Sequence, residues 1–467
     1  MISPSVNAGP SADDKPYPNH AYACYVIFVL FVVTVLSQLD RQLPTLLVEP
    51  IRREFAISDT AFSFLQGYAF SLVYTFAGLP LGRLVDQRSR RLLIFWGLLF
   101  WSLMTVFAGF AQNYTSLFMA RMGVGIGEAV LAPAAYSIIA DYFAPARRGR
   151  ALGIYYISIA IGSGASLLLG GYLLQLIPSE GMTMPFIGHL LAWRWVFIVA
   201  GLPGLLLSVL MFTIREPERR ELAQRRNVPI SELLAFLRGE RATFGRLLFY
   251  PSILAIIGYG SLAWAPSVFT RRFNLDISHS GMLLGGLIAA AGILGGLISG
   301  HLSDYWRTKG LQAARFRVAL VGQLLLLPCV STWSLMPTSS MALGVLFFAV
   351  LGLSIAQSAA PAAIQEVTPN TMRGQVIAIY LLLGGLLGIG LGPTLVAVTS
   401  DLVFAGEALH LAVSATAFPV SLLGLWLCWS GQSRYALTRE RIWGGDVTAD
   451  RGRTLDINKT NTSSENI

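Results

Sequence analysis

Charged residues are scarce in this chain. Only 13% of its 467 residues are Asp, Glu, Lys or Arg, whereas soluble domains carry about 25%. Hydrophobic residues make up 54% of the sequence, and the mean hydropathy is +0.61. This balance excludes an ordinary soluble protein and indicates a chain that lies mostly in lipid.

Residues that carry phosphate, metal or redox chemistry are also few. The three lysines, Lys15, Lys309 and Lys459, each follow a residue other than glycine, so the Gly-Lys pair of a nucleotide-binding P-loop is missing. The three cysteines lie in separate apolar runs, and the five histidines form no cluster with metal-ligand spacing. We therefore expect no ATP drive, no cofactor, no metal and no enzymatic activity.

What the chain does contain is a series of twelve apolar runs. Each is about 20 residues or more, long enough to cross a hydrocarbon core of about 30 Å. The predicted spans are 22–48, 58–81, 92–112, 114–140, 150–177, 193–214, 247–270, 279–303, 314–333, 338–365, 375–399 and 408–430. The sequence thus predicts an all-α membrane protein with twelve transmembrane helices in two halves of six.

The same runs predict how the chain is organised. The segments expected are an N-terminal tail 1–20, a first half 21–214, a linker 215–246, a second half 247–430 and a tail 431–467. The N-terminal tail lacks the basic region of a signal peptide, so the first span is expected to stay in the mature protein. Residues 230–240 alternate apolar and charged residues at helical spacing, which predicts an amphipathic helix at the membrane surface. The polar tail after residue 431 is predicted to be disordered.

Basic residues are concentrated on one side of the predicted membrane. With an even number of spans and both termini inside, most of the 34 Lys and Arg residues fall in cytoplasmic segments, as the positive-inside rule requires. The net charge of +9 therefore reflects membrane orientation rather than nucleic-acid binding. We expect a monomeric, multi-pass protein of the cell (inner) membrane with cytoplasmic termini.

One loop occurs twice. Gly82-Arg83-Leu84-Val85-Asp86 returns as Gly300-His301-Leu302-Ser303-Asp304, and Arg148-Gly149 returns as Arg373-Gly374. Repeats in the same order in each half indicate duplication, which is how many secondary transporters are built.

The repeated loop and its flanking arginines are predicted to form a latch that holds one conformation. Glycine lets a neighbouring helix approach closely, and an aspartate at the membrane boundary attracts a helix N-terminus or pairs with arginine. The alternative is that these residues only set the orientation in the membrane. The predicted latch residues are Gly82, Asp86, Arg90, Arg91, Arg148, Gly300 and Asp304.

Four charged residues lie inside predicted spans and well away from the span ends. They are Asp40 and Arg41 in the first span, and Arg121 and Glu128 in the fourth. A rise of 1.5 Å per residue puts Asp40 and Arg121 at similar depths in the outer third and Glu128 near the middle. We therefore expect an Asp40–Arg121 ion pair if the two spans are neighbours. Arg121 and Glu128 are seven residues apart and share one helix face.

These four residues predict proton and substrate sites. A carboxylate whose affinity for protons depends on a nearby arginine is what proton coupling needs, so Asp40 and Glu128 are the predicted coupling residues. Arg41, Arg121 and Glu128 are also predicted to bind substrate. The alternatives are an interfacial Asp40-Arg41 pair that reaches water and a structural hydrogen bond at Glu128. The glycines in 123–127 are expected to pack against a helix rather than to bind phosphate.

The second half offers aromatic rather than charged residues. Its spans have no charge near mid-membrane, and Trp264 and Tyr380 are the aromatic residues predicted to contact substrate. A cavity charged on one wall and apolar on the other suits an amphipathic molecule.

These features resemble a known family. Twelve spans in two halves, with G-x-L-x-D after the second and eighth, resemble the major facilitator superfamily. Leu39-Asp40-Arg41, the run from Arg121 to Ala129 and Ile139-Ala140-Asp141-Tyr142-Phe143 look like its spinster branch. That branch carries sphingosine-1-phosphate and lysolipids in animals.

The resemblance implies the major facilitator fold and a secondary transporter that works by alternating access. Its expected partners are protons and an amphipathic, anionic or lipid-like small molecule. An Asp-Arg pair in the first span also occurs in organic-anion symporters of the superfamily, so an organic-anion or multidrug transporter is an alternative. An uncoupled lipid scramblase or channel is the alternative from another class.

Overall fold

The computed structural model describes residues 17–178, 180–184, 188–219, 228–311, 313–369 and 371–461, and it is almost entirely helical. The elements up to residue 214 are α1 (His20–Gln42), η1 (Leu43–Leu46), α2 (Val48–Phe55), α3 (Asp59–Ser63), η2 (Phe64–Tyr68), α4 (Ala69–Gln87), α5 (Arg90–Gly109), α6 (Tyr114–Glu128), α7 (Leu131–Tyr142), α8 (Pro145–Leu176), β1 (Met182–Met184), β2 (Gly188–Leu190), α9 (Ala192–Ser208) and η3 (Val209–Thr213).

The elements that follow are α10 (Ile230–Gly239), α11 (Arg241–Phe273), α12 (Ile277–Thr308), α13 (Ala314–Thr332), η5 (Trp333–Leu335), α14 (Ser339–Glu366), α15 (Arg373–Leu383), η6 (Gly384–Leu391), α16 (Gly392–Val403) and α17 (Leu409–Asn461). The antiparallel hairpin of β1 and β2, with Met182 opposite Leu190, was not expected from the sequence.

The helices match the predicted spans closely. Within the described residues, eleven helices are long and apolar enough to cross a membrane. A twelfth span forms if Asp59–Gly78 and Pro80–Gln87, bent by 44°, are taken together. The all-α membrane fold predicted from the sequence is therefore confirmed.

The fourth span is broken in a way that the apolar run did not reveal. It consists of α6, which ends at Glu128, and α7, which begins at Leu131. Pro133 lacks the N–H that would bond to the carbonyl of Ala129, so one hydrogen bond of a regular helix is missing at this point. The break leaves Glu128 at a helix end in the interior of the protein.

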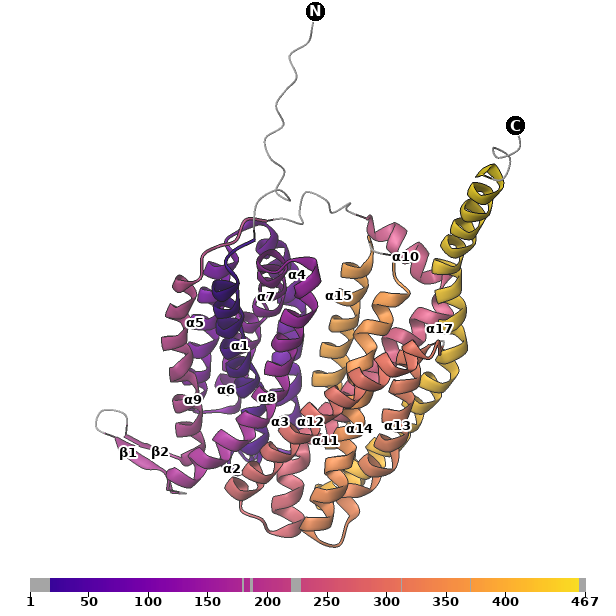
Figure 1. Ribbon diagram of the computed structural model, residues 1–467. Helices are drawn as coiled ribbons and strands as arrows, with labels where there is room; N and C mark the ends of the chain where they lie inside the picture. The colour runs from indigo at the N-terminus through magenta and orange to yellow at the C-terminus, as the bar shows by residue number, and fades with distance from the viewer. Residues whose placement is uncertain are drawn as a thin grey trace, which may run out of the picture.

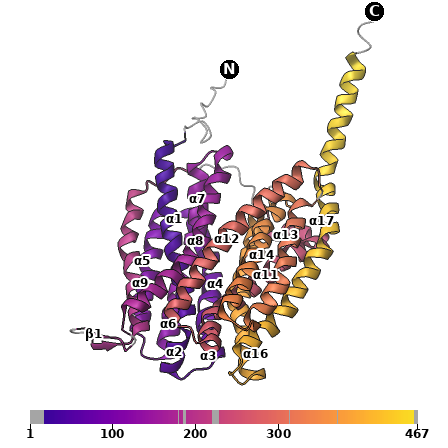
Figure 2. The ribbon, with the colours of Figure 1, turned by 60° about the horizontal axis from the view of Figure 1, so that its bottom comes forward.

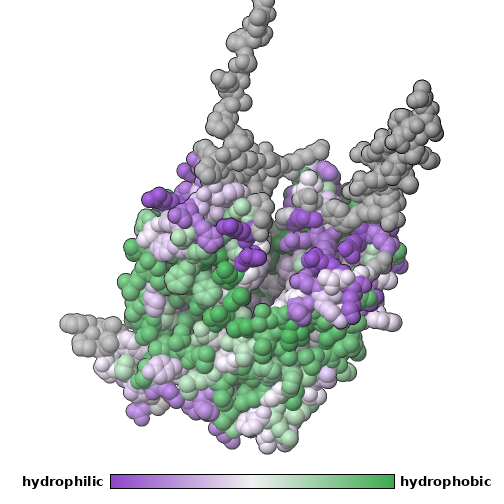
Figure 3. All heavy atoms as spheres, in the orientation of Figure 1, coloured by the Kyte–Doolittle hydropathy of each residue, from purple (hydrophilic) through white to green (hydrophobic). Residues whose placement is uncertain are grey.

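The helices gather into two bundles that lie side by side (Figures 1 and 2), one from α1 to α9 and one from α11 to α17. We call the end where α1 begins, and toward which α17 runs, the terminal face; α2, α3 and the hairpin lie at the opposite face. Figure 3 shows a broad apolar belt with polar residues above and below it. The surface is hollowed between the two bundles on the side of the terminal face.

Each bundle has its own apolar core. Around Leu98, Trp101 and Ile138 the first bundle encloses a cluster of fully buried side chains. A larger cluster begins in the second bundle and continues into α2, α8 and α9 of the first. The bundles are therefore joined by continuous packing only in part of their length.

Close packing of glycines joins the bundles along α8 and α12. A Cβ on Gly164 would come within 2.7 Å of the Gly285 carbonyl oxygen, and one on Gly285 within 2.5 Å of the Gly164 carbonyl oxygen. The helices are equally close about two turns away, where a Cβ on Gly171 would lie 2.6 Å from the Ser278 carbonyl oxygen. Such distances leave no room for a side chain, so the two backbones are in direct contact.

Two π-helical segments meet between the bundles. They are η2, which precedes α4, and η6, which separates α15 from α16. A Cβ on Gly67 of η2 would lie 2.6 Å from the carbonyl oxygen of Ile389 in η6. A π-helical turn holds one more residue than an α-helical turn and occurs often at functional sites.

The C-terminal helix is longer than expected. Disorder is predicted from residue 431 on, whereas α17 continues to Asn461. The part of α17 just beyond residue 431 contacts the rest of the second bundle. Tyr435 donates a hydrogen bond to Glu366, and Thr438 Oγ1 donates to Glu240 Oε2 at 2.9 Å. α10 lies at the terminal face (Figure 1), in the segment for which the sequence predicts an amphipathic helix.

Candidate functional site

Four charged side chains, Asp40, Arg41, Arg121 and Glu128, lie together in the interior of the first bundle. Asp40 and Arg121 are each 1% exposed, Glu128 is 0% exposed, and the Arg41 side chain is 17% exposed. We call them the central charge cluster. A charge buried in a membrane protein costs several kcal/mol, of the order of 3 or more, unless it is paired. Which members are paired therefore decides what the cluster can do.

Arg41 and Glu128 form an ion pair. The Arg41 Nε donates to Glu128 Oε2 at 2.6 Å, and the Ser37 hydroxyl donates to the same oxygen at 2.8 Å. The Arg41 guanidinium carbon also lies 4.8 Å and 4.6 Å from the ring centres of Phe70 and Tyr74. Within the described part of the chain, Glu128 Oε1 is buried without a hydrogen-bond partner.

The expected ion pair between Asp40 and Arg121 is wrong. Arg121 Nη1 donates instead to the backbone carbonyl of Asp40 at 3.0 Å. Both carboxylate oxygens of Asp40, and Nε of Arg121, are buried without a partner among the described residues. The Asp40 carboxylate lies near Trp101 and Thr105 of α5. Neighbouring residues of a helix point about 100° apart, so Asp40 and Arg41 face different elements although their depths are similar.

A small cavity of about 20 Å³ adjoins this cluster. Residues of both bundles line it, among them Arg41, Gln66 and Arg121 from the first and Tyr259, Ala263 and Pro393 from the second. This volume holds about one water molecule. Two guanidinium groups thus face an interior space whose other wall is aromatic and apolar.

The two aromatic residues predicted to contact substrate lie in different surroundings. Trp264 is fully buried, donates its Nε1 proton to the Pro393 carbonyl at 2.9 Å and packs edge-on against Phe62. It does not line the small cavity. Tyr380 lies on α15, near Tyr156 and Tyr259. Its role as a substrate contact stays a prediction.

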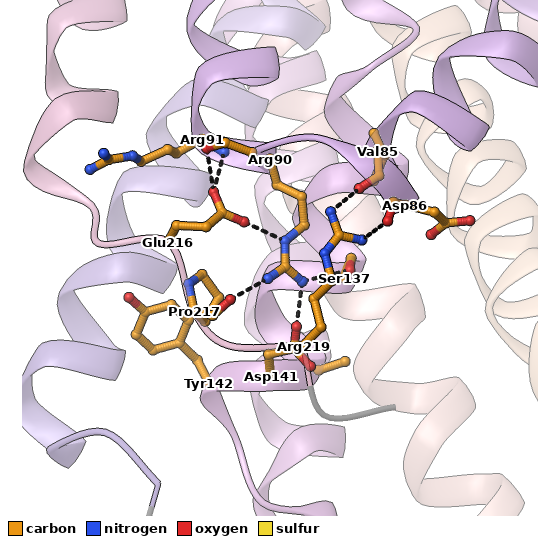
Figure 4. A network of polar contacts seen from close by, with 12 residues as sticks. Val85, Asp86, Arg90, Arg91, Ser137, Asp141, Tyr142, Glu216, Pro217 and Arg219 are labelled. Carbon is orange, nitrogen blue, oxygen red and sulfur yellow. Dashed lines mark hydrogen bonds and ion pairs between the residues drawn. The ribbon is translucent and has the colours of Figure 1, made fainter. Parts of the chain in front are cut away.

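A second network lies near the terminal face and is centred on Arg90 (Figure 4). Arg90 is 0% exposed, forms an ion pair with Asp141, and donates to Glu216 Oε1 at 2.7 Å and to Ser137 Oγ at 2.8 Å. The backbone N–H of Arg91 donates to Glu216 Oε2 at 3.1 Å. We call these residues the Arg90 network; all of them belong to the first bundle except Glu216, which lies in the linker that follows it.

Four other predicted latch residues, Gly82, Asp86, Gly300 and Asp304, form no hydrogen bond or ion pair between the bundles among the described residues. Among the described residues the carboxylates of Asp86 and Asp304 have no hydrogen-bond or ion-pair partner, and both are exposed. A Cβ on Gly82 or Gly300 would meet nothing within 4 Å. Arg148 donates to the Ala140 carbonyl at 2.9 Å, within its own bundle. The latch therefore stays a prediction for another conformation, in which the terminal face is closed.

An ion-pair cluster joins the bundles at the opposite face. Asp59 of α3 is 0% exposed and accepts hydrogen bonds from Arg271 of α11, from Nη1 at 2.9 Å and from Nη2 at 2.7 Å. Arg52 Nη1 lies 2.9 Å from Asp59 Oδ1, and Arg271 Nε donates to Glu49 at 2.7 Å. The Ser400 hydroxyl donates to Asp59 Oδ2 at 3.2 Å. We call this group the Asp59 cluster.

Comparison with known proteins agrees with this architecture. The family model described as Major Facilitator Superfamily matches residues 30–393. The chain belongs to the major facilitator superfamily. It is therefore a transporter rather than an enzyme, and it is a multi-pass membrane protein.

Relatives within the superfamily include two bacterial transporters. The chain is 29% identical to a protein of Mycolicibacterium smegmatis named an MFS-type efflux pump, over 93% of this chain and 98% of the relative. It is 30% identical to a probable L-galactonate transporter of Escherichia coli, over 61% of this chain and 62% of the relative.

A superfamily member of known structure confirms the resemblance to the spinster branch. This protein is described as a bacterial homologue of the human lysosomal transporter spinster, in an inward-facing and unoccupied conformation. Its TM-score with this chain is 0.74 at 25% identity, and the match covers 91% of this chain and 98% of that one.

Within this superfamily fold, the sequence alone did not reveal the Asp59 cluster or the acidic partners of Arg90. Asp59 and Arg271 are distant in the chain and belong to different halves, so no local pattern joins them. Glu216 lies in the linker, where a charged residue is ordinary. Asp141 carried a signal, because it lies at the end of an apolar run in the stretch that resembles the spinster branch.

Glu216 gives the Arg90 network a pH dependence. Burial acts to raise the pKa of Glu216, but hydrogen bonds from Arg90, Ser89 and the Arg91 backbone lower it by more, so its pKa lies below the usual range. Glu216→Gln is expected to lower the melting temperature by about 2–4 °C at pH 7, because it removes charge-assisted bonds. A carboxylate with a lowered pKa stabilises the folded state at pH values above the pKa of the unfolded chain, which is about 4.3 for glutamate. This stabilisation disappears as the pH falls through the lowered pKa of the folded state.

Thermal unfolding of the purified protein between about pH 7 and pH 3.5 would check this expectation. The difference between wild type and Glu216→Gln should shrink as the pH falls below about 4. Glu232→Gln, on the exposed side of α10, is the matched control and should have no effect at any pH. A difference that stayed constant with pH would mean that Glu216 acts through packing rather than charge.

Proposed function

We propose that this protein is a proton-coupled secondary transporter for an amphipathic anionic molecule, working by alternating access. The observation that carries the proposal is the central charge cluster. Arg41, which is paired with Glu128, and Arg121, which has no ion pair among the described residues, border a cavity lined by both bundles. In this view the terminal face is cytoplasmic, both termini are inside the cell, and the protein lies in the inner membrane as a monomer.

Competition for Arg41 supports the proposed proton coupling. Glu128 in its ionised form holds the Arg41 guanidinium at 2.6 Å. When Glu128 takes up a proton, the attraction is lost and Arg41 is free to bind an anionic group of the substrate. The carboxylate oxygens of Asp40 are buried without a hydrogen-bond partner among the described residues. Asp40 therefore supplies a second place for a proton, because burying an ionised carboxylate without a partner is costly and binding a proton removes that cost.

The two walls of the cavity support the proposed substrate class. Arg41 and Arg121 offer guanidinium donors, which suit carboxylate or phosphate oxygens. Tyr259, Ala263 and Pro393 on the other wall offer aromatic and apolar surface for a hydrophobic portion. The name of the relative from Escherichia coli, a probable L-galactonate transporter, is consistent with an anionic substrate. An organic anion without a lipid tail is the second candidate.

The asymmetry of the contacts between the bundles supports the proposed alternating access. The terminal face is hollowed, whereas the opposite face is held by the Asp59 cluster and by the glycine contacts of α8 and α12. A transporter that exposes its cavity to one side at a time needs such a difference. The reverse state would break the Asp59 cluster and close the latch residues at the terminal face.

The test is uptake by proteoliposomes with and without a pH gradient. The panel contains lysophospholipids, sphingoid phosphates, sugar acids including L-galactonate, and cationic drugs. We expect gradient-driven transport of an anionic member, and we expect Arg121→Ala to reduce it by about 100-fold, the loss that follows removal of a buried charged contact. Arg150→Ala, an exposed arginine of α8, is the control. A leak that ignores the gradient would indicate a scramblase or channel instead.

A further inference from the structure

A second, larger cavity lies at the outer edge of the second bundle, between the beginning of α13 and the part of α17 near the terminal face. Its volume is about 460 Å³, and it is lined by Ala313, Arg317, Trp429, Ser430, Gln432 and Ser433. The two helices run side by side at the edge of the molecule (Figures 1 and 2). This cavity is far from the central charge cluster in the chain and shares no residue with it.

Local packing explains how the cavity forms. At Gly431 the two helices touch, and a Cβ there would come within 2.8 Å of the Phe316 ring. Side chains on either side of this contact, at Ser430 and Gln432, flank the space beside it. The close approach at glycine thus fixes the spacing of the helices and leaves a cavity beside the contact.

The lining is a set of hydrogen-bond donors without an acid. Arg317 is exposed and has no ion-pair partner within the described residues, whereas Arg315 is paired with Glu366 at 3.1 Å. Gln432 Nε2 is buried without a hydrogen-bond partner in the same part of the chain. Arg246 adds a second cation behind the lining, because its Nε donates to Ser430 Oγ at 3.0 Å. Two guanidinium groups, an amide and hydroxyls suit the oxygens of a phosphate group.

The position of the cavity suits a lipid rather than a soluble anion. Trp429 is 69% exposed, and tryptophan is enriched where the bilayer meets water. One to two turns away along α17, toward the opposite face, Leu422, Leu423 and Trp426 present exposed apolar surface. A headgroup in the cavity would thus lie above a surface on which acyl chains can pack.

We propose that this cavity binds the phosphate headgroup of an anionic phospholipid in the leaflet at the terminal face. Arg317 contacts the phosphate, Gln432 and Ser433 donate hydrogen bonds to its oxygens or to the glycerol, and Trp429 packs beside the glycerol backbone. Basic pockets between transmembrane helices are a recognised setting for such headgroups. The site is separate from the transport pathway and does not depend on the proposed function.

The test is native mass spectrometry of the detergent-purified protein with added lipid. We expect phosphatidylglycerol to be retained over phosphatidylcholine, and Arg317→Gln to weaken that retention about fivefold, the effect of one cationic contact with an anionic lipid. Gln432→Leu is expected to weaken it in the same direction. Arg150→Gln, an exposed arginine of the first bundle, is the matched control and should retain the wild-type preference.

A second arm distinguishes lipid from soluble phosphate. Inorganic phosphate and glycerol phosphate at millimolar concentration should displace little of the bound phosphatidylglycerol. Displacement by either would mean that the site takes a soluble phosphate and would overturn the proposal. Equal retention of the two lipids by the wild type, or unchanged preference in Arg317→Gln and Gln432→Leu, would overturn it as well. The wild-type comparison decides even if a variant does not fold.

Discussion

Glu128→Gln is expected to abolish substrate accumulation driven by a pH gradient. Glutamine keeps the shape of the side chain and can still accept the hydrogen bonds of Arg41 and Ser37, but it cannot take up or release a proton. One proton moved per substrate down a gradient of about one pH unit supports about tenfold accumulation, since tenfold corresponds to about 1.4 kcal/mol. The variant should only equilibrate its substrate across the membrane.

Accumulation and exchange measured in the same proteoliposomes separate this effect from loss of folding. Exchange of labelled for unlabelled substrate needs no net proton movement, so it should persist in Glu128→Gln. Asp40→Asn tested in parallel shows whether the second carboxylate also couples. Glu232→Gln is the control for loss of one carboxylate at the surface. Undiminished accumulation by Glu128→Gln would remove Glu128 from proton coupling.

Arg271→Glu is expected to turn the transporter toward the conformation that is open at the opposite face. The substitution places a third carboxylate beside Glu49 and Asp59 and removes three hydrogen bonds between the bundles. Breaking a buried ion pair costs about 3–5 kcal/mol. Each 1.4 kcal/mol changes an equilibrium about tenfold, so the conformation seen here is expected to become the minor one.

Spin-label distances across the terminal face would measure this change. Labels at Gln87 of α4 and Arg307 of α12, both exposed, report how far apart the bundles are there, after replacement of the three native cysteines. The distance should shorten in Arg271→Glu as the terminal face closes. Glu180→Gln, an exposed change in the loop after α8, should leave it unchanged. A distance equal to that of the wild type would show that the Asp59 cluster stabilises the fold without governing access.

The twelve spans could be predicted because a membrane imposes length and apolarity, and both are visible in any run of residues. Residues 123–127 were also interpreted correctly: a Cβ on Gly125 would lie 2.7 Å from the Phe70 carbonyl oxygen, so these glycines are a packing face. The burial of Asp40, Arg121 and Glu128 followed from their depth in the spans.

Partners within the site could not be predicted, since depth says nothing about direction around a helix axis. Asp40 and Arg121 share a depth, yet Arg121 reaches only the backbone of Asp40. The Asp59 cluster needed residues of both halves, and its members are ordinary loop and helix-end charges in the sequence. The burial of Arg90 was not predicted either. We expected this residue in a latch at the surface, but it is fully buried and forms ion pairs with Asp141 of its own bundle and with Glu216 of the linker.

The meeting of η2 with η6 affects how motion can spread through the molecule. Each π-helical segment stores one surplus residue in a helix that is otherwise regular. If the extra residue shifts by a few positions along the helix, the adjoining residues rotate about the helix axis. The hydrogen-bonded turns beyond them stay intact. We therefore expect rotation between the halves to be absorbed where Gly67 meets Ile389, without repacking of the cores around Trp101 and Trp333.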